Sequence, residues 1–235
     1  MNEFGQAFAA AYQLLVSLDA DLLEIVALSL WVSLSAVLMA TIVGVPLGAA
    51  LAVSRFPARG ALVAVLNALM GLPPVVVGLI VYLMLSRAGP LGDLGLLFTP
   101  TAMVIAQCVL VTPIVAALTR QTVQDLHEEY REQLVSLDVG RLDTMAALIW
   151  DGRYSLVTAI LAGFGRASAE VGAVIIVGGN INHVTRVMTT AIALETSKGD
   201  LALALGLGIV LLLIALSVNA AALGVRRAAL RYEGA

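Results

Sequence analysis

Two opposite charges lie four residues apart in an otherwise apolar stretch of the chain. Arg166 and Glu170 are about 6 Å apart along a helix axis, one helical turn. If that stretch crosses a bilayer, each charge costs about 2.5–3.5 kcal/mol and should face protein or a water-filled path. The basic residue comes first, which is the less favourable order at this spacing. We therefore expect at least one of the two to have a partner on a neighbouring helix.

Both a structural ion pair and a gate are compatible with these charges. Gly172 and Asn180, further along the same segment, join Arg166 and Glu170 as candidate pathway or gate residues. A lone arginine would trap an anion, and a lone glutamate would repel it, whereas adjacent opposite charges moderate both effects.

Residue types for other chemistry are scarce. Cys108 is the single cysteine, and neither His127 nor His183 lies in a sequence cluster with metal-ligand spacing. The sequence contains no GxxxxGK[ST] phosphate loop, and Lys198 is its only lysine. We predict no catalytic residue, metal or cofactor in this chain. If ATP drives its activity, the ATP and Mg²⁺ bind to a separate ATPase subunit.

The composition is that of a membrane protein. Of 235 residues, 60% are hydrophobic and 12% are charged, and the mean hydropathy is +1.00, whereas soluble domains are about half apolar and a quarter charged. The formal net charge of -3 and the scattered basic residues give no nucleic-acid signal. Long apolar runs predict an all-α protein with about five transmembrane helices. The expected spans are 22–53, 61–85, 101–118, 156–177 and 201–225.

Arginine positions predict the orientation, because basic residues near span ends collect on the cytoplasmic side. Those that follow the first span, lie in the third connection or follow the last span belong to one side: Arg55, Arg59, Arg120, Arg131, Arg141, Arg153, Arg226, Arg227 and Arg231. The other side receives Arg87, Arg186 and Lys198. We therefore expect the N-terminus outside and the C-terminus inside. The expected layout is an external N-terminal segment 1–21, a transmembrane domain 22–225 and a cytoplasmic basic tail 226–235.

The third connection, 119–155, is the most polar stretch, yet it contains apolar residues at three- and four-residue steps from Val123 to Leu137. This pattern predicts an amphipathic helix, with a break at Gly140 and a second short helix after it. Its apolar face needs a partner surface. That surface is another protein, the protein's own spans or the membrane.

Small residues and prolines predict a packed bundle with broken helices. Gly44 and Gly48 form a GxxxG pair around Pro46, and the tract 71–78 (GLPPVVVG) interrupts the second span. The outer connection 179–198 either contacts a soluble partner or closes the bundle.

Several tracts together resemble a known family. EQLVSLDVGR at 132–141 resembles the EAA loop of ABC importer permeases, and AEVGA at 169–173 with VGGNI at 177–181 resembles the segment after that loop in the sulfate, molybdate and tungstate group. The tracts 71–78, 86–92 and 186–197 look most like tungstate permeases. The resemblance extends from about residue 30 to 220.

This resemblance implies the transmembrane domain of a type I, binding-protein-dependent, MetI-like ABC importer in the prokaryotic cytoplasmic (inner) membrane. It implies a homodimer, two ABC ATPase subunits seated against the region around Glu132 in a cytoplasmic coupling loop at about 119–155, and an extracytoplasmic oxyanion-binding protein. The residues implied in ATPase coupling are Glu132, Leu134, Leu137, Asp138, Gly140 and Arg141.

The EAA-like loop departs from the family pattern. Aligned from Glu132, the usual alanines are Gln133 and Leu134, and the family glycine falls on Asp138, with Gly140 two residues later. The function expected from the resemblance is ATP-driven import of an oxyanion: tungstate, or alternatively molybdate or sulfate. A secondary anion transporter or channel, with Arg166 and Glu170 as ion-coupling groups, is the alternative from a different class. A purely structural assembly subunit is a third interpretation.

Overall fold

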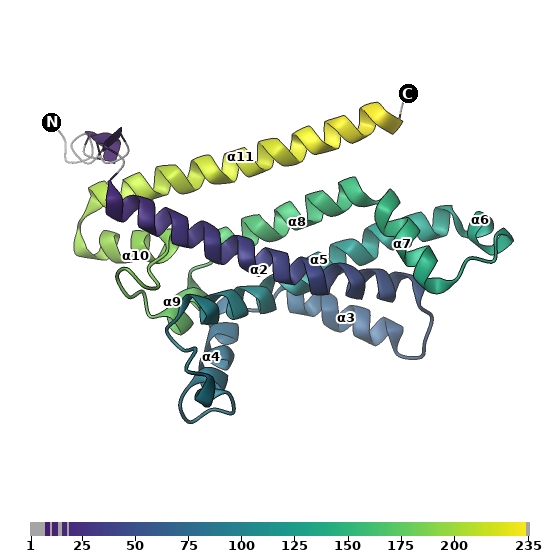
Figure 1. Ribbon diagram of the computed structural model, residues 1–235, viewed down its shortest axis with the longest axis horizontal. Helices are drawn as coiled ribbons and strands as arrows, with labels where there is room; N and C mark the ends of the chain where they lie inside the picture. The colour runs from purple at the N-terminus through teal and green to yellow at the C-terminus, as the bar shows by residue number, and fades with distance from the viewer. Residues whose placement is uncertain (1–7, 10, 14–15, 18, 234–235) are drawn as a thin grey trace. The chain divides into compact units, whose positions relative to one another are not determined.

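The computed structural model describes residues 8–9, 11–13, 16–17 and 19–233. The predicted external segment 1–21 lies mostly outside the described residues. Within them, every regular element is a helix and no strand is present. The helices are α2 (Ala20–Val53), α3 (Arg59–Met70), α4 (Pro74–Leu85), η1 (Gly92–Leu94), α5 (Pro100–Glu129), α6 (Arg131–Ser136), α7 (Arg141–Asp151), α8 (Arg153–Ser168), α9 (Gly172–Gly178), α10 (Met188–Lys198) and α11 (Leu201–Glu233) (Figure 1).

The predicted all-α class is confirmed for the described residues, which contain three to five candidate membrane spans. Three of the described helices are long and apolar enough to cross a membrane: α2, α5 and the stretch Leu201–Ala221 of α11. Two further pairs qualify when each bent pair is taken as one span: α3 with α4, bent by 99°, and α7 with α8, bent by 75°. The predicted interruption of the second span is confirmed, because the turn before Pro74 separates α3 from α4.

The prediction of one continuous fourth span over 156–177 is wrong. Helix α8 ends at Ser168, and a new short helix, α9, begins at Gly172. The predicted outer connection also contains a helix that the sequence pattern did not reveal, α10. Its buried face is largely polar or small (Thr189, Thr190, Ala191 and Glu195), so it lacks the apolar stripe by which an amphipathic helix is recognised.

The chain divides into two compact units. The first contains Met1–Ala36, Pro73–Gln107 and Arg166–Ser217, and the second contains Val37–Leu72, Cys108–Gly165 and Val218–Ala235. The core of the first unit includes Leu22, Ile25, Met188, Ala191 and Leu207. Its helices α4 and α9 pack side by side (Figure 1). A Cβ atom on Gly78 would lie 2.7 Å from the Cα atom of Ala173, so this contact requires glycine.

Close packing of α2 on α5 organises the second unit. A Cβ atom on Gly44 would lie 3.1 Å from Val115 Cβ, and one on Gly48 would lie 2.8 Å from Thr119 Cβ. The prediction of a close helix contact at this GxxxG pair is confirmed. Helix α2 continues through Pro46.

Beyond this contact, Ala49 and Ala52 of α2 form a cluster with Val123 of α5 and Leu148 of α7. The α7 helix is thereby fixed against α5. Many large apolar side chains on α2 remain exposed, among them Leu34, Leu38 and Ile42, which is the expected surface of a helix that faces lipid.

Candidate functional site

Arg166 and Glu170 form the predicted ion pair. Arg166 Nη1 donates to Glu170 Oε2. The Glu170 side chain is 3% exposed, and that of Arg166 is 32% exposed. The carboxylate is therefore buried, while its partner guanidinium remains partly accessible.

Glu170 is held from three directions because it lies in the break between α8 and α9. Its Oε1 atom accepts the N–H of Ala173 in the first turn of α9 at 3.0 Å, where a negative charge is favoured by the helix dipole. The backbone carbonyl oxygen of Glu170 accepts a hydrogen bond from the hydroxyl of Thr189, on α10, at 2.7 Å. The charged groups themselves pair locally: the Glu170 carboxylate bonds Arg166 and the backbone of Ala173. The contact from α10 is made to the backbone of Glu170 and not to its charge. The unfavourable order of the charges applies to a continuous helix, and here the helix ends between them.

A small polar cavity adjoins Glu170 in the first unit. It has a volume of about 10 Å³ and is lined by Ser29, Ser33, Gln107 and Thr189, among others. Gln107 donates to the carbonyl of Ala167 at 3.0 Å, while its buried Oε1 atom has no partner among the described residues. One water molecule fits a site of this size and polarity.

Sequence reasoning missed this polar group. Gln107 is a lone amide within an apolar run and could have been noticed by the rule applied to Arg166. Ser29 gave no such signal, because its role depends on a distant contact: its hydroxyl accepts the N–H of Met188 at 2.7 Å.

The other two candidate pathway residues do not share one place. Gly172 lies beside Glu170, and a Cβ atom there would be 2.9 Å from Val75 Cγ2, so it closes the α4–α9 contact. Asn180 follows the opposite end of α9, after seven helical residues, or about 10 Å. It has φ 50° and donates to the carbonyl of Thr190 at 3.4 Å. The structure thus brings together Arg166, Glu170 and Gly172, and sets Asn180 apart.

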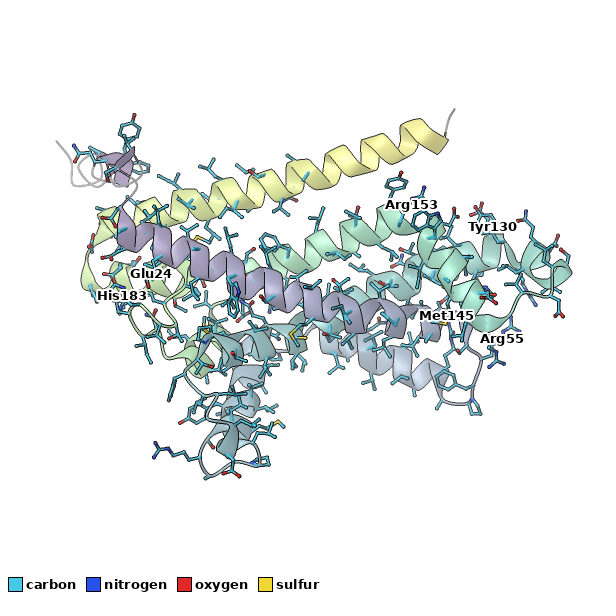
Figure 2. All side chains as sticks on the ribbon, in the orientation of Figure 1. Glu24, Arg55, Tyr130, Met145, Arg153 and His183 are labelled. Carbon is cyan, nitrogen blue, oxygen red and sulfur yellow. The ribbon has the colours of Figure 1, made fainter. Side chains whose placement is uncertain are left out.

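The connection between α9 and α10 carries a second charge pair. His183 Nδ1 lies 2.8 Å from Glu24 Oε2 of α2, and both side chains are exposed (Figure 2). The hydrogen bond to Glu24 raises the pKa of His183, with the negative charges of Glu24 and Asp21 adding to it and nearby Arg186 opposing it. Ligand atoms of Asp21, Glu24 and His183 lie within 4.8 Å of one another. Sequence spacing could not show this grouping, because His183 lies 159 positions after Glu24.

Helix α10 contains a buried carboxylate that the sequence analysis did not single out. Glu195 accepts from Lys198 Nζ at 3.0 Å and lies 3.7 Å from Arg186 Nη1. Two cations therefore neutralise this one carboxylate, and they link the residues just before α10 to its last turn.

The predicted coupling segment is a helical hairpin formed by α6 and α7, beyond the end of α5 (Figure 1). The prediction of a single amphipathic helix from Val123 to Leu137 is wrong, because α5 ends at Glu129 and Tyr130 separates it from α6. The break near Gly140 and the second short helix are confirmed. Leu134 packs at the edge of the cluster around Leu148.

The remaining candidate coupling residues lie around the turn between α6 and α7. Glu132, Leu137 and Arg141 are exposed, and Gly140 precedes the first residue of α7. Asp138 has φ 48°, the left-handed conformation that favours glycine. The position where the family pattern has glycine therefore keeps the backbone shape of glycine, and Asp is one of the side chains that best tolerate it.

Large apolar side chains are exposed on this hairpin. The exposed fractions are 73% for Val135, 73% for Leu137, 79% for Leu142 and 71% for Trp150. Leu137 and Trp150 also line an apolar groove of about 330 Å³, together with Tyr130, Gln133, Leu134, Ala147, Leu148 and Asp151. A polar segment with this much exposed apolar surface is typical of a protein–protein contact.

Comparison with known proteins decides the family. Residues 44–229 match the binding-protein-dependent transport system inner membrane component family. The chain belongs to this family. That match covers the hairpin, both broken-helix pairs and the Arg166–Glu170 pair, so family membership and the apolar helices together establish a multi-pass membrane protein.

Individual relatives indicate the group within this family to which the chain is most similar. The chain is 42% identical over 220 residues, 94% of its length and 96% of the relative's, to the tungstate uptake system permease protein TupB of Peptoclostridium acidaminophilum. It is 40% identical over 210 residues, 87% of its length and 90% of the relative's, to a probable anion ABC transporter permease protein of Haloferax volcanii. It is 30% identical over 168 residues, 68% of its length and 74% of the relative's, to the molybdenum transport system permease protein ModB of Azotobacter vinelandii. These relatives place it among ABC importer permeases for oxyanions.

Proposed function

We propose that this chain is the membrane permease subunit of an ATP-driven tungstate importer. The observation that carries the proposal is the 42% identity to a tungstate permease along almost the entire chain. Identity to a molybdenum permease is lower and covers less of the chain. Molybdate, as a tetrahedral dianion of the same kind, is the competing substrate.

In this proposal two copies of the chain form the translocation path in the prokaryotic cytoplasmic membrane. The N-terminus is outside, residues 22–225 form the transmembrane domain, and the basic tail 226–235 is in the cytoplasm. An extracytoplasmic binding protein delivers the oxyanion to the outer face. Two ABC ATPase subunits bind the cytoplasmic face and hold the ATP and Mg²⁺ that this chain does not bind itself.

The α6–α7 hairpin is the proposed docking surface for the ATPase. Its exposed apolar side chains, Val135, Leu137 and Leu142, gain most from being covered. Glu132 and Arg141 flank them and supply charges that orient the contact. Leu134 and Asp138 shape the hairpin from inside, through packing and through the left-handed turn. The α6–α7 hairpin passes the ATP-driven movement of the ATPase to α5 and α7.

The Arg166–Glu170 pair is proposed to lie next to the anion path, as a neutralised pair. The partly accessible guanidinium of Arg166 offers a weak attraction to a dianion, and Glu170 prevents tight binding. Gly172 and Asn180 border the same path at the two ends of α9. A path that must release its cargo benefits from such a moderate charge.

Tungsten uptake tests the substrate. Cells that contain the chain, its ATPase and its binding protein should accumulate tungsten, and excess molybdate should compete more weakly than excess tungstate. Deleting the chain should abolish uptake. Equal or stronger competition by molybdate would reassign the substrate, and unchanged uptake without the ATPase would favour a secondary transporter.

Cysteine cross-linking tests the docking surface. In a variant with Cys108→Ser, single cysteines at 131–142 should cross-link to the co-expressed ATPase, with Glu132→Cys and Leu137→Cys among the strongest. A cysteine at Arg87, exposed in the first unit, is the matched control. Absence of cross-links at every position from 131 to 142 would refute the docking surface.

A further inference from the structure

A polar cavity of about 380 Å³ lies in the second unit, at the C-terminal end of α2. Its walls are the end of α2, the connection to α3 and the last turns of α5, with the first residue of α6. The lining residues are Ala52, Val53, Ser54, Arg55, Arg59, Gln124, His127, Glu128 and Arg131. Arg55 marks this place on the connection after α2 in Figure 2. The cavity is separate from the Arg166–Glu170 pair, and it shares only Arg131, the first residue of α6, with the hairpin.

The cavity wall has an excess of positive charge. Three arginines face one glutamate, and the Glu128 carboxylate accepts from the amide of Gln124 at 3.1 Å. Among the described residues, neither Arg55, Arg59 nor Arg131 forms an ion pair. Unneutralised guanidinium groups around one cavity attract an anion.

Part of this wall is built rigidly. Arg59 Nε donates to the carbonyl of Leu51 at 2.7 Å, and its Nη2 donates to Gln124 Oε1 at 3.2 Å. Arg120 Nη1 donates to the same Gln124 oxygen at 2.7 Å. The buried Nδ1 atom of His127 has no partner among the described residues. The scaffold is thus fixed by Arg59 and Gln124, while Arg55 and Arg131 keep their donors available.

We propose that this cavity binds a tetrahedral oxyanion group, either the phosphate of an anionic phospholipid or a free oxyanion. Arginine forks match the geometry of phosphate oxygens. The volume lies at the lower end of small-molecule sites, so the group fits with its water shell or with part of a lipid headgroup. The cavity also follows directly after the apolar helix α2, the depth at which headgroups lie. Anion binding at this cavity does not depend on the proposed transport function. The assignment of the cavity to the cytoplasmic face of the membrane does rest on that proposal.

Binding to the purified chain in detergent tests the proposal. Thermal unfolding is measured with sodium phosphate, with sodium tungstate, with sodium chloride at equal ionic strength, and in micelles that contain phosphatidylglycerol or phosphatidylcholine. A saturable stabilisation by phosphate or tungstate identifies a free oxyanion. Stabilisation by phosphatidylglycerol alone, with lipid retained in native mass spectrometry, identifies a headgroup.

Matched variants locate the binding. Arg55→Gln and Arg131→Gln should each weaken it about fivefold, whereas Arg87→Gln, the same charge loss at an exposed residue outside the cavity, should leave it unchanged. Ser54→Asp adds a negative charge to the wall without removing an arginine and should also weaken binding, so the test does not depend on the folding of the arginine variants.

Absence of saturable binding for phosphate, tungstate and phosphatidylglycerol, or equal weakening by Arg87→Gln, would overturn the proposal. A chain that imports tungstate but shows no such binding loses this inference alone. A chain that binds phosphate at the cavity but imports no oxyanion loses the proposed function alone.

Discussion

Glu170 shows how one residue combines structural and electrostatic tasks. Its side chain joins α8 to α9, since one carboxylate oxygen accepts from Arg166 and the other from the backbone of Ala173. Removing one member of a buried pair leaves an uncompensated charge and costs about 3–5 kcal/mol, while replacing both by apolar residues is often mild. Glu170 is therefore needed for folding, and an effect of its loss on transport must be measured separately from its effect on stability.

A double-mutant cycle separates these roles. Arg166→Leu and Glu170→Leu should each lower the thermal stability of the purified chain strongly, and the double variant should lose less than the sum of the two. Glu170→Leu should be the more harmful, because the Ala173 N–H also loses its acceptor. Stability is measured by thermal unfolding, and transport by tungsten uptake. Simple additivity would show that the two side chains are not coupled. A double variant that folds normally but does not transport would favour the pathway role.

His183 provides a pH-dependent contact on the predicted outer side. Glu24 and Asp21 raise its pKa, and Arg186 acts against them. Its protonated form donates to Glu24, so this contact stabilises the folded chain below the unperturbed pKa of about 6.5 and is lost as the pH rises through the raised pKa. Glu24→Gln should return the pKa of His183 toward its ordinary value, as measured by NMR of labelled imidazole. The chain has two histidines, so the signal of His127 is an internal control. An unchanged pKa of His183 in Glu24→Gln would contradict this account.

At the scale of helices, two glycines of α2 set the distance between α2 and α5. Gly44 and Gly48 let the two backbones approach, and the facing residues Val115, Ala116 and Thr119 have no room to retreat, because all three are buried. The contact aligns the end of α2 with the part of α5 that leads to the hairpin.

Gly48→Ala should destabilise the folded chain by about 1–3 kcal/mol through overpacking. A Cβ atom on Gly60, in α3, would meet no other atom within 4 Å, so Gly60→Ala is the matched control. It should cause no loss and can add up to about 1 kcal/mol, because alanine suits a helix better than glycine. Both are measured as shifts in unfolding in detergent. Equal effects of the two substitutions would show that the α2–α5 contact does not require glycine.

How far the sequence predicts these elements depends on what sets their ends. Long apolar runs located α2, α5 and α11, since spanning a bilayer needs about 20 apolar residues. The break before Pro74 was marked by Gly71 and two prolines. The break between α8 and α9 lacked such a signal, because it depends on a local side-chain contact of Glu170 with the backbone of Ala173 and on a tertiary contact with Thr189. Likewise, Arg166 and Glu170 were identifiable as charges in an apolar run, whereas the contact of Ser29 with Met188 joins positions 159 apart.

For the whole molecule, the main prediction is its orientation in the membrane. An impermeant thiol reagent should label Lys198→Cys in intact cells and leave Arg141→Cys unlabelled, both in a Cys108→Ser background. Arginine distribution predicts this result. Both positions are exposed in the isolated chain, and the cells lack the ATPase proposed to cover Arg141, so a lack of labelling at Arg141→Cys is not due to burial. Permeabilised cells, where both should react, are the control. The reverse pattern in intact cells would invert the topology.

The contact between α4 and α9 has a consequence for the kinetics of local opening. Helix α9 has seven residues and α4 has twelve, and helices this short are marginal by themselves. Their stability comes from packing through Gly78 and Ala173, so neither can unfold without exposing the other. Amide hydrogens of 76–82 and 174–178 should therefore exchange with deuterium at a common rate, as one cooperative unit. A Gly78→Ala substitution should accelerate both sets together, because the two helices share one barrier.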